Sequence, residues 1–265
     1  MMIEKGKLGL KIAYKSLKKD IENHLNIMKN IAIIIPTLNE SENIHSLVKA
    51  IQAKVPKSTI FIVDDSKDEK MKKVIDQKKL KVEYFHRKNS SGRGSAIIYG
   101  LKKAIKKNKY RIFIEMDADF SHNPNELKRN INYFNSNNLD LLIASRYLNG
   151  SSITNWKLSR RVFSYSANFL ARNLINIDIK DFTNGFRIYS PRAAKKITAS
   201  CGNIGDGFII LSEIIVVLKN NNYKIDEIKT IFVNRTRGQS SVNLKLIILS
   251  FAGLLKLFFI KKRLK

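Results

Sequence analysis

The sequence predicts an α/β fold: a mostly parallel central sheet with helices on both of its faces. From Ile31 onward, short apolar runs alternate with Lys-rich helical stretches, a pattern typical of parallel strands that helices cover on both sides. The chain has 265 residues, 44% of them hydrophobic, which is enough to form one large core. It contains only 12 Gly and 4 Pro, so a disordered or fibrous chain is not expected.

Five apolar segments in the first part of the chain are expected to form strands, with helices between them. The expected strands are Ile31–Ile35, Thr59–Val63, Val82–His86, Arg111–Met116 and Leu139–Ala144. The expected helices are Ser41–Ala53, Glu69–Gln77, Ser95–Lys107 and Pro124–Asn135. Ligands of such sheets bind at the carboxyl ends of the strands, so the polar residues that follow the strands are the candidates for function.

The pattern is less regular after Ser145. The elements expected there are a basic amphipathic stretch from Trp156 to about Ile175, a strand at Phe186–Ser190, a helix near Asp206–Asn220 and a strand at Lys224–Val233.

The last apolar stretch, Val242–Ile260, contains Lys245 and Lys256. A spanning helix needs roughly 20 apolar residues with few charges, so this stretch is expected to lie at a membrane interface or to anchor weakly. Packing on the core is the alternative. Residues 1–30 are rich in Lys and lack the continuous apolar core of a secretory signal. The chain is therefore expected to divide into a basic extension (1–30), an α/β domain (31–241) and a C-terminal membrane-associating helix (242–265).

The chain carries a net charge of +27, from 49 Lys and Arg against 22 Asp and Glu. Such a charge attracts nucleic acid, anionic lipid or phosphorylated substrates. A compositional bias toward Lys, Asn and Ile would produce it as well, so the charge alone identifies no partner. No acidic residue follows Glu227, whereas nine basic residues do. The single cysteine, Cys201, excludes an intramolecular disulfide and offers no zinc framework.

The strongest local motif is Asp117-Ala118-Asp119, directly after an expected strand. Two carboxylates separated by one residue can hold one divalent cation, Mg²⁺ or Mn²⁺, that bridges the diphosphate of a nucleotide-sugar. The cation would neutralise the charge that grows on the departing diphosphate. The motif is short enough to recur by chance, so it is weak by itself. His122, beside it, is expected to be structural.

Three more polar motifs follow expected strands or precede a helix. The first, Pro36–Glu40, offers polar groups to a nucleoside, and Pro36 is expected to end its strand. The second, Val63–Ser66, offers a carboxylate to a base or ribose. In Gly92–Gly94, the glycines allow close backbone approach at a helix N-terminus, where Arg93 adds a guanidinium for phosphate. Each motif alone would also suit an ordinary turn.

Together and in this order, the four motifs resemble glycosyltransferase family 2 with the GT-A fold, and the rest of the chain resembles its dolichol-phosphate mannose synthase branch. The further matching motifs are Ser145-Arg146-Tyr147, Trp156 with Arg160 and Ser164, Asp181–Arg187, Gly207-Phe208 with Glu213, and Phe232–Ser240. The resemblance runs from about Ile31 to Ile260. It departs at Ser241, where the family usually has Lys, and after Asp65, where the family's usual Gly is missing.

The resemblance and the motifs assign roles to individual residues. The residues expected to bind the donor are Pro36, Thr37, Glu40, Asp65, Arg93, Asp117, Ala118, Asp119 and Arg235. Asp117 and Asp119 are implied as the ligands of Mg²⁺ or Mn²⁺. Arg146 and Arg160, with Ser164, are implied as binders of the acceptor phosphate, and Asp119, Arg146 and Arg160 as the catalytic residues.

The implied reaction is an inverting, metal-dependent transfer of a hexose, with mannose from GDP-mannose favoured, to a polyprenyl (dolichyl) phosphate. This acceptor is already anionic at neutral pH, since the second pKa of a phosphomonoester is about 6, so it needs positioning rather than a general base. The protein is expected at the cytoplasmic face of a membrane, peripheral or weakly anchored. A small membrane subunit is an additional candidate partner.

Alternatives remain open at this point. The same motifs would serve UDP-glucose or another UDP-sugar as donor, or a saccharide hydroxyl as acceptor. The charge would suit a nucleic-acid-binding protein, but the sequence has no helix-turn-helix, RNP or zinc-finger pattern, so no nucleic-acid partner is expected. Ser241 in place of Lys would also suit a catalytically silent subunit of a membrane complex.

Overall fold

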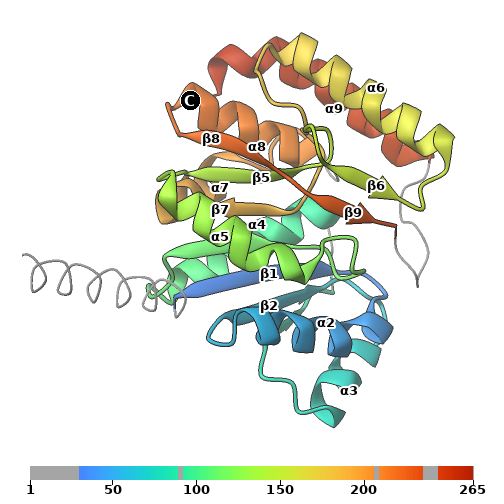
Figure 1. The fold of residues 1–265 in the computed structure, drawn as a ribbon, viewed down its shortest axis with the longest axis vertical. Helices are drawn as coiled ribbons and strands as arrows, with labels where there is room; N and C mark the ends of the chain where they lie inside the picture. Colours follow the sequence, from blue (N-terminus) through green and yellow to red (C-terminus); the bar gives the residue numbers. More distant parts are fainter. Residues whose placement is uncertain (1–29, 89–91, 206–208, 235–243, 265) are drawn as a thin grey trace, which may run out of the picture.

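A computed structural model describes residues 30–88, 92–205, 209–234 and 244–264 (Figure 1). It confirms the predicted α/β fold, with a seven-stranded sheet in the order β3-β2-β1-β4-β7-β5-β8. The strands are β1 (Ile31–Thr37), β2 (Thr59–Asp64), β3 (Glu83–His86), β4 (Ile112–Glu115), β5 (Leu141–Ser145), β7 (Arg187–Tyr189) and β8 (Ile225–Lys229).

One strand of this sheet runs against the others. β7 pairs antiparallel with both β4 and β5, whereas the other neighbours in the sheet are parallel. The amino end of an antiparallel strand lies beside the carboxyl ends of its neighbours. The segment that leads into β7, residues 181–186, therefore lies at the edge of the sheet where the polar motifs gather.

Helices cover both faces of the sheet, as predicted (Figure 1). One face packs against α2 (Ser41–Lys54), α3 (Lys70–Gln77), the 3₁₀ turn η1 (Pro124–Glu126) and α5 (Leu127–Ser136); the other packs against α4 (Gly92–Lys106), α7 (Pro191–Ser200) and α8 (Ile209–Asn220). In β1, Ile33 points to the first face and Ile34 to the second, and both are fully buried. Burial on both faces explains the continuous apolar run of this strand.

Two further helices form an outer layer over α8. They are α6 (Leu158–Ile175) and α9 (Leu244–Ile260), which ends in the 3₁₀ turn η2 (Lys261–Arg263), and they lie side by side (Figure 1). Leu254 and Leu257 of α9 are buried in the core. The ammonium of Lys261 donates to the carbonyl oxygens of Leu174 and Ile175, at 2.6 and 3.0 Å, and so caps the end of α6.

The C-terminal helix is therefore packed on the domain on one side. None of the helices in the described ranges combines the length and the apolar character that a membrane span needs. The basic extension expected at residues 1–30 lies outside the described residues, except for Asn30.

Two expectations about the elements were wrong, and one helix was not predicted. The expected strand Lys224–Val233 is broken at Thr230, because Ile231–Val233 forms β9 and pairs in a second, two-stranded sheet with β6 (Ser152–Thr154). Helix α7 was not predicted, although Ser190 caps it by accepting a hydrogen bond from the Ala193 N–H at 3.2 Å. Pro36 does not end β1: a proline lacks only the N–H, and pairing continues to Thr37.

Candidate active site

The polar motifs predicted from the sequence lie at one edge of the sheet. They follow the carboxyl ends of β1, β2, β4 and β5, and the segment before β7 joins them there. Because β1 lies between β2 and β4 in the sheet, the motifs after these three strands are neighbours. This edge is where parallel α/β sheets bind their ligands.

Asp64 organises the loops that follow β1 and β2. Its Oδ1 accepts hydrogen bonds from the hydroxyl groups of Thr37 and Ser66, at 3.0 and 2.6 Å, and from the Ser66 N–H at 3.1 Å. Its Oδ2 accepts one from the Tyr84 hydroxyl at 3.0 Å. Burial and the neighbouring Asp64 charge raise the pKa of Tyr84. Asp64 is fully buried, so its hydrogen bonds fix the two loops from within the protein.

Asp65 is held by an arginine that the sequence analysis missed. The Arg87 Nε and Nη2 donate to the two oxygens of Asp65, both at 2.6 Å, and Nη1 donates to the Ser95 hydroxyl at 2.9 Å. This bidentate pair fixes the plane of the carboxylate. The signal in the sequence was a basic residue directly after the third strand, a position outside the predicted site.

The other residues expected after β1 lie in the same loop. Pro36 and Thr37 are the last residues of β1, and Glu40 accepts a hydrogen bond from the Asn43 side-chain amide at 2.7 Å. Asn39 adopts a left-handed conformation, with φ of 58°, and its N–H donates to the Ser66 hydroxyl at 2.8 Å. This bond joins the loops after β1 and β2 into one surface.

The acidic loop Asp117–Asp119 turns sharply after β4. Ala118 and Asp119 are buried, whereas the Asp117 side chain is 29% exposed. Asp119 Oδ1 accepts the Ser121 N–H at 3.0 Å. The next residue, Phe120, has φ of 62°, a conformation that costs free energy for a bulky side chain and is found mostly at functional sites. The fold thus maintains a strained turn that presents these two carboxylates.

His122 supports the acidic loop from the interior of the protein. Its Nδ1 accepts the Asp117 N–H at 2.9 Å, so Nε2 carries the proton and donates to Asn184 Oδ1 at 2.9 Å. Its ring stacks on Phe186, with centroids 5.2 Å apart. Both ring nitrogens are used inside the protein and the residue is buried, in agreement with the structural role expected for it.

The donor set of this loop fits a divalent cation bound together with a diphosphate. Within the described ranges, no group of three or more His, Cys, Asp or Glu side chains gathers to hold a metal. Mg²⁺ and similar cations are commonly bound by only one or two carboxylates, with phosphate and water oxygens completing the shell. Asp117 and Asp119 could supply such a pair of hard oxygen ligands.

Arg146 is fixed by a buried ion pair. Its Nε and Nη2 each donate to one oxygen of Asp181, both at 2.8 Å, and Nη2 also donates to the Thr183 hydroxyl at 2.7 Å. Burial alone would raise the pKa of Asp181, but the Arg146 charge and hydrogen bonds from Arg146 and Thr183 outweigh it and lower the pKa. The guanidinium carbon lies 5.5 Å from the centre of the Trp156 ring, which leaves the group in an aromatic environment.

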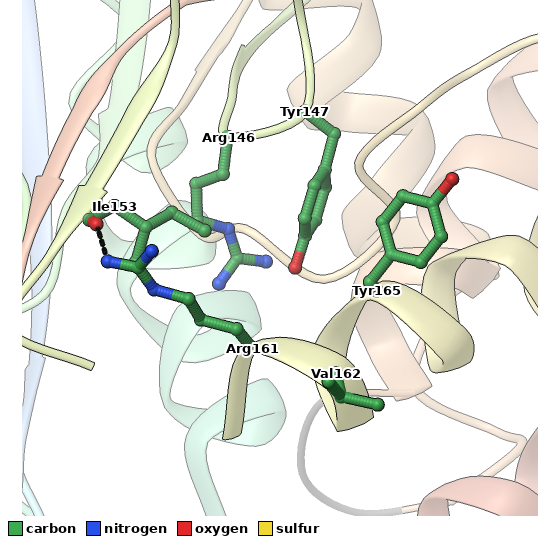
Figure 2. Close-up of a pocket in the computed structure, with 6 residues that line it drawn as sticks. All are labelled: Arg146, Tyr147, Ile153, Arg161, Val162 and Tyr165. Atoms are coloured by element: carbon green, nitrogen blue, oxygen red, sulfur yellow. Dashed lines mark hydrogen bonds between the residues drawn. The ribbon is translucent and has the colours of Figure 1, made fainter. Parts of the chain in front are cut away.

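A pocket of about 370 Å³ opens beside Arg146 (Figure 2). Its walls are formed by Arg146, Tyr147, Ile153, Arg161, Val162 and Tyr165. The Arg161 guanidinium donates to the Ile153 carbonyl oxygen and so stays at the pocket wall (Figure 2). The pocket combines two arginines with an apolar and aromatic lining, which suits an anionic group attached to an apolar chain.

Of the residues expected to bind the acceptor phosphate, Arg146 lines this pocket, but Ser164 and Arg160 do not. Ser164 lies behind it, where its hydroxyl accepts a hydrogen bond from Tyr147 at 2.6 Å. Arg160 does not line the pocket: its guanidinium stacks over Trp156, 4.1 Å from the ring centre, and donates to Asn234 at 3.1 Å. The neighbouring Arg161, which the sequence analysis did not single out, lines the pocket instead. Arg235 lies outside the described residues.

Residues 181–187 join the two halves of the site. Asp181 holds Arg146, and its Oδ1 also accepts the Asn184 N–H at 3.0 Å. Asn184 in turn binds His122 beneath the acidic loop. Arg187, which is fully buried, donates to the carbonyl oxygens of Phe182, Asn184 and Leu211. This segment was noticed in the sequence as a motif, but its connecting role was not predicted.

Comparisons with known proteins agree with this architecture. The model of the family described as "Glycosyl transferase family 2" matches residues 32–198. Polyprenol monophosphomannose synthase of Mycolicibacterium smegmatis is 32% identical over 80% of this chain and 80% of its own length. Undecaprenyl-phosphate mannosyltransferase of Micrococcus luteus is 28% identical over 80% of this chain and 87% of its own.

A solved structure has the same fold. Glucosyl-3-phosphoglycerate synthase from Mycobacterium tuberculosis, in complex with Mn²⁺, UDP and glucosyl-3-phosphoglycerate, superimposes with a TM-score of 0.62. The match covers 86% of this chain and 79% of that one, at 16% sequence identity. At this identity the likeness extends to the fold alone.

Proposed function

The chain belongs to glycosyl transferase family 2 and is a glycosyltransferase, and we propose that it transfers mannose from GDP-mannose to a polyprenyl phosphate with inversion. Two relatives that bear the names of polyprenyl-phosphate mannosyltransferases support this acceptor and this sugar. The observation that carries the proposal is the position of the acidic loop and the arginine pocket at one edge of the sheet, joined by residues 181–187.

In this proposal the loops after β1, β2 and β4 bind the donor. Asp65, with its plane fixed by Arg87, would accept hydrogen bonds from the nucleoside, beside the loop of Pro36, Thr37 and Glu40. Asp117 and Asp119 would hold a Mg²⁺ or Mn²⁺ ion, which neutralises charge on the departing diphosphate when bound. Ala118 would bring its backbone close to the donor, and Arg235 would clamp the diphosphate.

The pocket beside Arg146 would bind the acceptor phosphate. The Asp181 carboxylate fixes Arg146, so its guanidinium would meet the phosphate without reorienting. Arg161 faces the same pocket, and Arg160 and Ser164 would support it through Trp156 and Tyr147. The phosphate attacks as an anion, so positioning in line with the leaving diphosphate would provide most of the catalysis.

A donor screen tests this function. The full-length protein would be incubated with Mn²⁺, a polyprenyl phosphate and either GDP-mannose, UDP-glucose or UDP-N-acetylglucosamine, followed by lipid extraction and mass measurement. We expect a product heavier by one hexose with GDP-mannose. Product with a UDP-sugar only would reject the donor, and transfer only to a soluble saccharide would reject the acceptor.

Arg161 offers a test of the acceptor pocket. Because a charge-assisted hydrogen bond contributes about 1.5–3 kcal/mol, Arg161→Ala should raise the KM for polyprenyl phosphate about tenfold to a hundredfold. The KM for the donor should change little. Arg172→Ala, a change of the same kind further along α6, is the control. An unchanged acceptor KM in Arg161→Ala would remove this residue from the pocket's function.

Exposed apolar side chains on α6 and α9 form what we call the α6–α9 apolar face. They are Leu158, Val162, Phe163, Tyr165, Phe169 and Leu170 on α6, and Leu249, Phe251, Leu255 and Phe259 on α9. Neither helix contains an acidic residue, and Lys261–Arg263 follow α9 directly. Val162 and Tyr165 also line the arginine pocket, so the face begins at the proposed acceptor site.

We propose that this face rests in a bilayer containing anionic lipid, at the cytoplasmic side, and holds the protein there as a peripheral protein. The apolar side chains would enter the interface while the basic residues meet anionic headgroups, at about 1 kcal/mol for each Lys or Arg. On this proposal residues 1–30 are a basic extension, 31–241 the catalytic domain and 242–265 the membrane-associating helix. A small membrane subunit covering the same face is the competing arrangement.

Vesicle binding tests the proposed membrane surface. Phe163→Asp combined with Phe259→Asp should lower binding to anionic liposomes at least about a hundredfold, since burying each aromatic contributes about 1.5–3 kcal/mol. The melting temperature should stay the same, because both side chains are exposed. Leu38→Asp is the control, because Leu38 is an apolar position outside the two helices with 49% exposure, close to the 48% of Phe163. Equal sedimentation of all variants with liposomes would contradict the proposal.

A further inference from the structure

Arg93 lies between two carboxylates at the end of β4. Its Nε and Nη2 donate to Asp117 Oδ1 at 3.1 and 2.7 Å, and its Nη1 lies 2.6 Å from Glu115 Oε1. The contact with Glu115 is an ion pair. Glu115 is 1% exposed, and its Oε2 accepts a hydrogen bond from the Tyr189 hydroxyl at 2.6 Å.

The surrounding fold is shaped to keep the guanidinium in this place. A Cβ atom at Gly185 would lie 2.0 Å from the Arg93 Nη2, so only glycine leaves room for the arginine. Gly185 belongs to the segment before β7 that also supports His122 through Asn184. Arg93 is thus enclosed by β4, the acidic loop and this segment, which differs from the phosphate-facing position expected from the sequence.

Negative charges outnumber positive ones in this cluster. Glu115, Asp117 and Asp119 supply three negative charges and Arg93 one positive charge, which leaves two negative charges. A divalent cation on Asp117 would lie next to the guanidinium, and charges a few ångströms apart in a partly buried site repel strongly. The same guanidinium is itself attracted by Glu115, which moderates its effect on the loop.

We propose that Arg93 is an internal counter-cation that weakens binding of the divalent cation to the empty acidic loop. The cation then binds tightly only when the diphosphate of a nucleotide adds its own negative charges. Arg93 would act in this way as a positioning residue that makes tight cation binding depend on the nucleotide. Glu115 would determine how strongly the Arg93 charge acts on the acidic loop. The proposal rests on the proposed metal–diphosphate site.

Mn²⁺ binding to the full-length protein, measured by electron paramagnetic resonance with and without GDP, tests this proposal. Without GDP, we expect Arg93→Met to bind Mn²⁺ at least about tenfold more tightly, because a positive charge next to the site is lost. Glu115→Gln should bind Mn²⁺ more weakly, because Glu115 no longer offsets part of the Arg93 guanidinium charge. Arg93→Lys keeps the charge and should resemble the wild type. With GDP, the differences should become smaller.

Arg93→Met and Glu115→Gln should change the Mn²⁺ affinity in opposite directions, which a merely structural role of Arg93 would not do. Arg93→Met that is folded, by its circular dichroism, and binds Mn²⁺ no more tightly than the wild type would overturn the proposal. Should Arg93→Met fail to fold, Glu115→Gln decides, and unchanged or tighter binding there overturns it. A wild-type protein that binds no Mn²⁺ even with GDP would instead reject the proposed metal site itself.

Discussion

Asp119→Asn will lower kcat by about a thousandfold or more if this residue holds the metal against the donor diphosphate. A bound cation provides several kcal/mol of transition-state stabilisation, and each 1.36 kcal/mol corresponds to a factor of ten in rate. An amide keeps the shape of the side chain and its contact with the Ser121 N–H but removes the charge. The measurement is the rate of mannosyl transfer to polyprenyl phosphate as a function of Mn²⁺ concentration.

Asp68→Asn is the matched control for this experiment. Asp68 is an exposed carboxylate that pairs with Lys70 at 3.1 Å and is not among the residues expected to bind the donor or the metal. The control should retain the wild-type rate and the wild-type Mn²⁺ dependence. If Asp119→Asn retained more than a tenth of the wild-type kcat, Asp119 would not be a ligand of the catalytic metal.

Arg146→Ala is expected to destabilise the protein by about 3–5 kcal/mol, because it leaves the fully buried Asp181 carboxylate without its partner. It should also abolish transfer to polyprenyl phosphate, since the pocket loses its best-fixed cation. The free energy of unfolding would be measured in urea. Arg146→Ala combined with Asp181→Asn removes the uncompensated charge, so it should recover part of the stability while activity stays lost.

Lys107→Ala is the matched control, because Lys107 forms an exposed ion pair with Glu83 at 2.5 Å. Exposed pairs contribute about 0–1 kcal/mol, so the control should unfold at nearly the wild-type urea concentration. Equal destabilisation by Lys107→Ala and Arg146→Ala would show that the buried pair with Asp181 contributes no more to the free energy of unfolding than an exposed pair.

The strands and helices of the first half of the chain were predictable because their sequence patterns are local. The strands from β1 to β5, except the half-buried β3, are short buried apolar runs, and all five were located within a few residues. The elements that were missed depend on distant partners. Whether Ile231–Val233 continues β8 or pairs with β6 is decided by Ser152–Thr154, about 80 residues earlier in the chain.

The candidate site was predictable as a set of loops but not as a set of contacts. The residue types and their order correctly placed Asp65, Asp117 and Arg146 at the edge of the sheet where the parallel strands have their carboxyl ends. The partners of these residues come from elsewhere: Arg87 holds Asp65, Arg93 holds Asp117, and Asp181 holds Arg146. Two neighbouring arginines in one helix cannot be told apart by sequence alone, and only the direction of each side chain placed Arg161 rather than Arg160 at the pocket.

The inner side of α9 has a consequence for any attempt to shorten the chain. Helix α8 is buried on every side, with every residue from Ile209 to Leu218 buried. Gly253 of α9 lies close enough that an added Cβ would be 2.8 Å from Ile209. A truncation designed to remove a detachable anchor would strip this covering from α8 and leave an aggregating fragment. On the proposed membrane surface, the helix that would contact the bilayer is also the helix that completes the core, so a change of lipid environment would act directly on the stability of the catalytic domain.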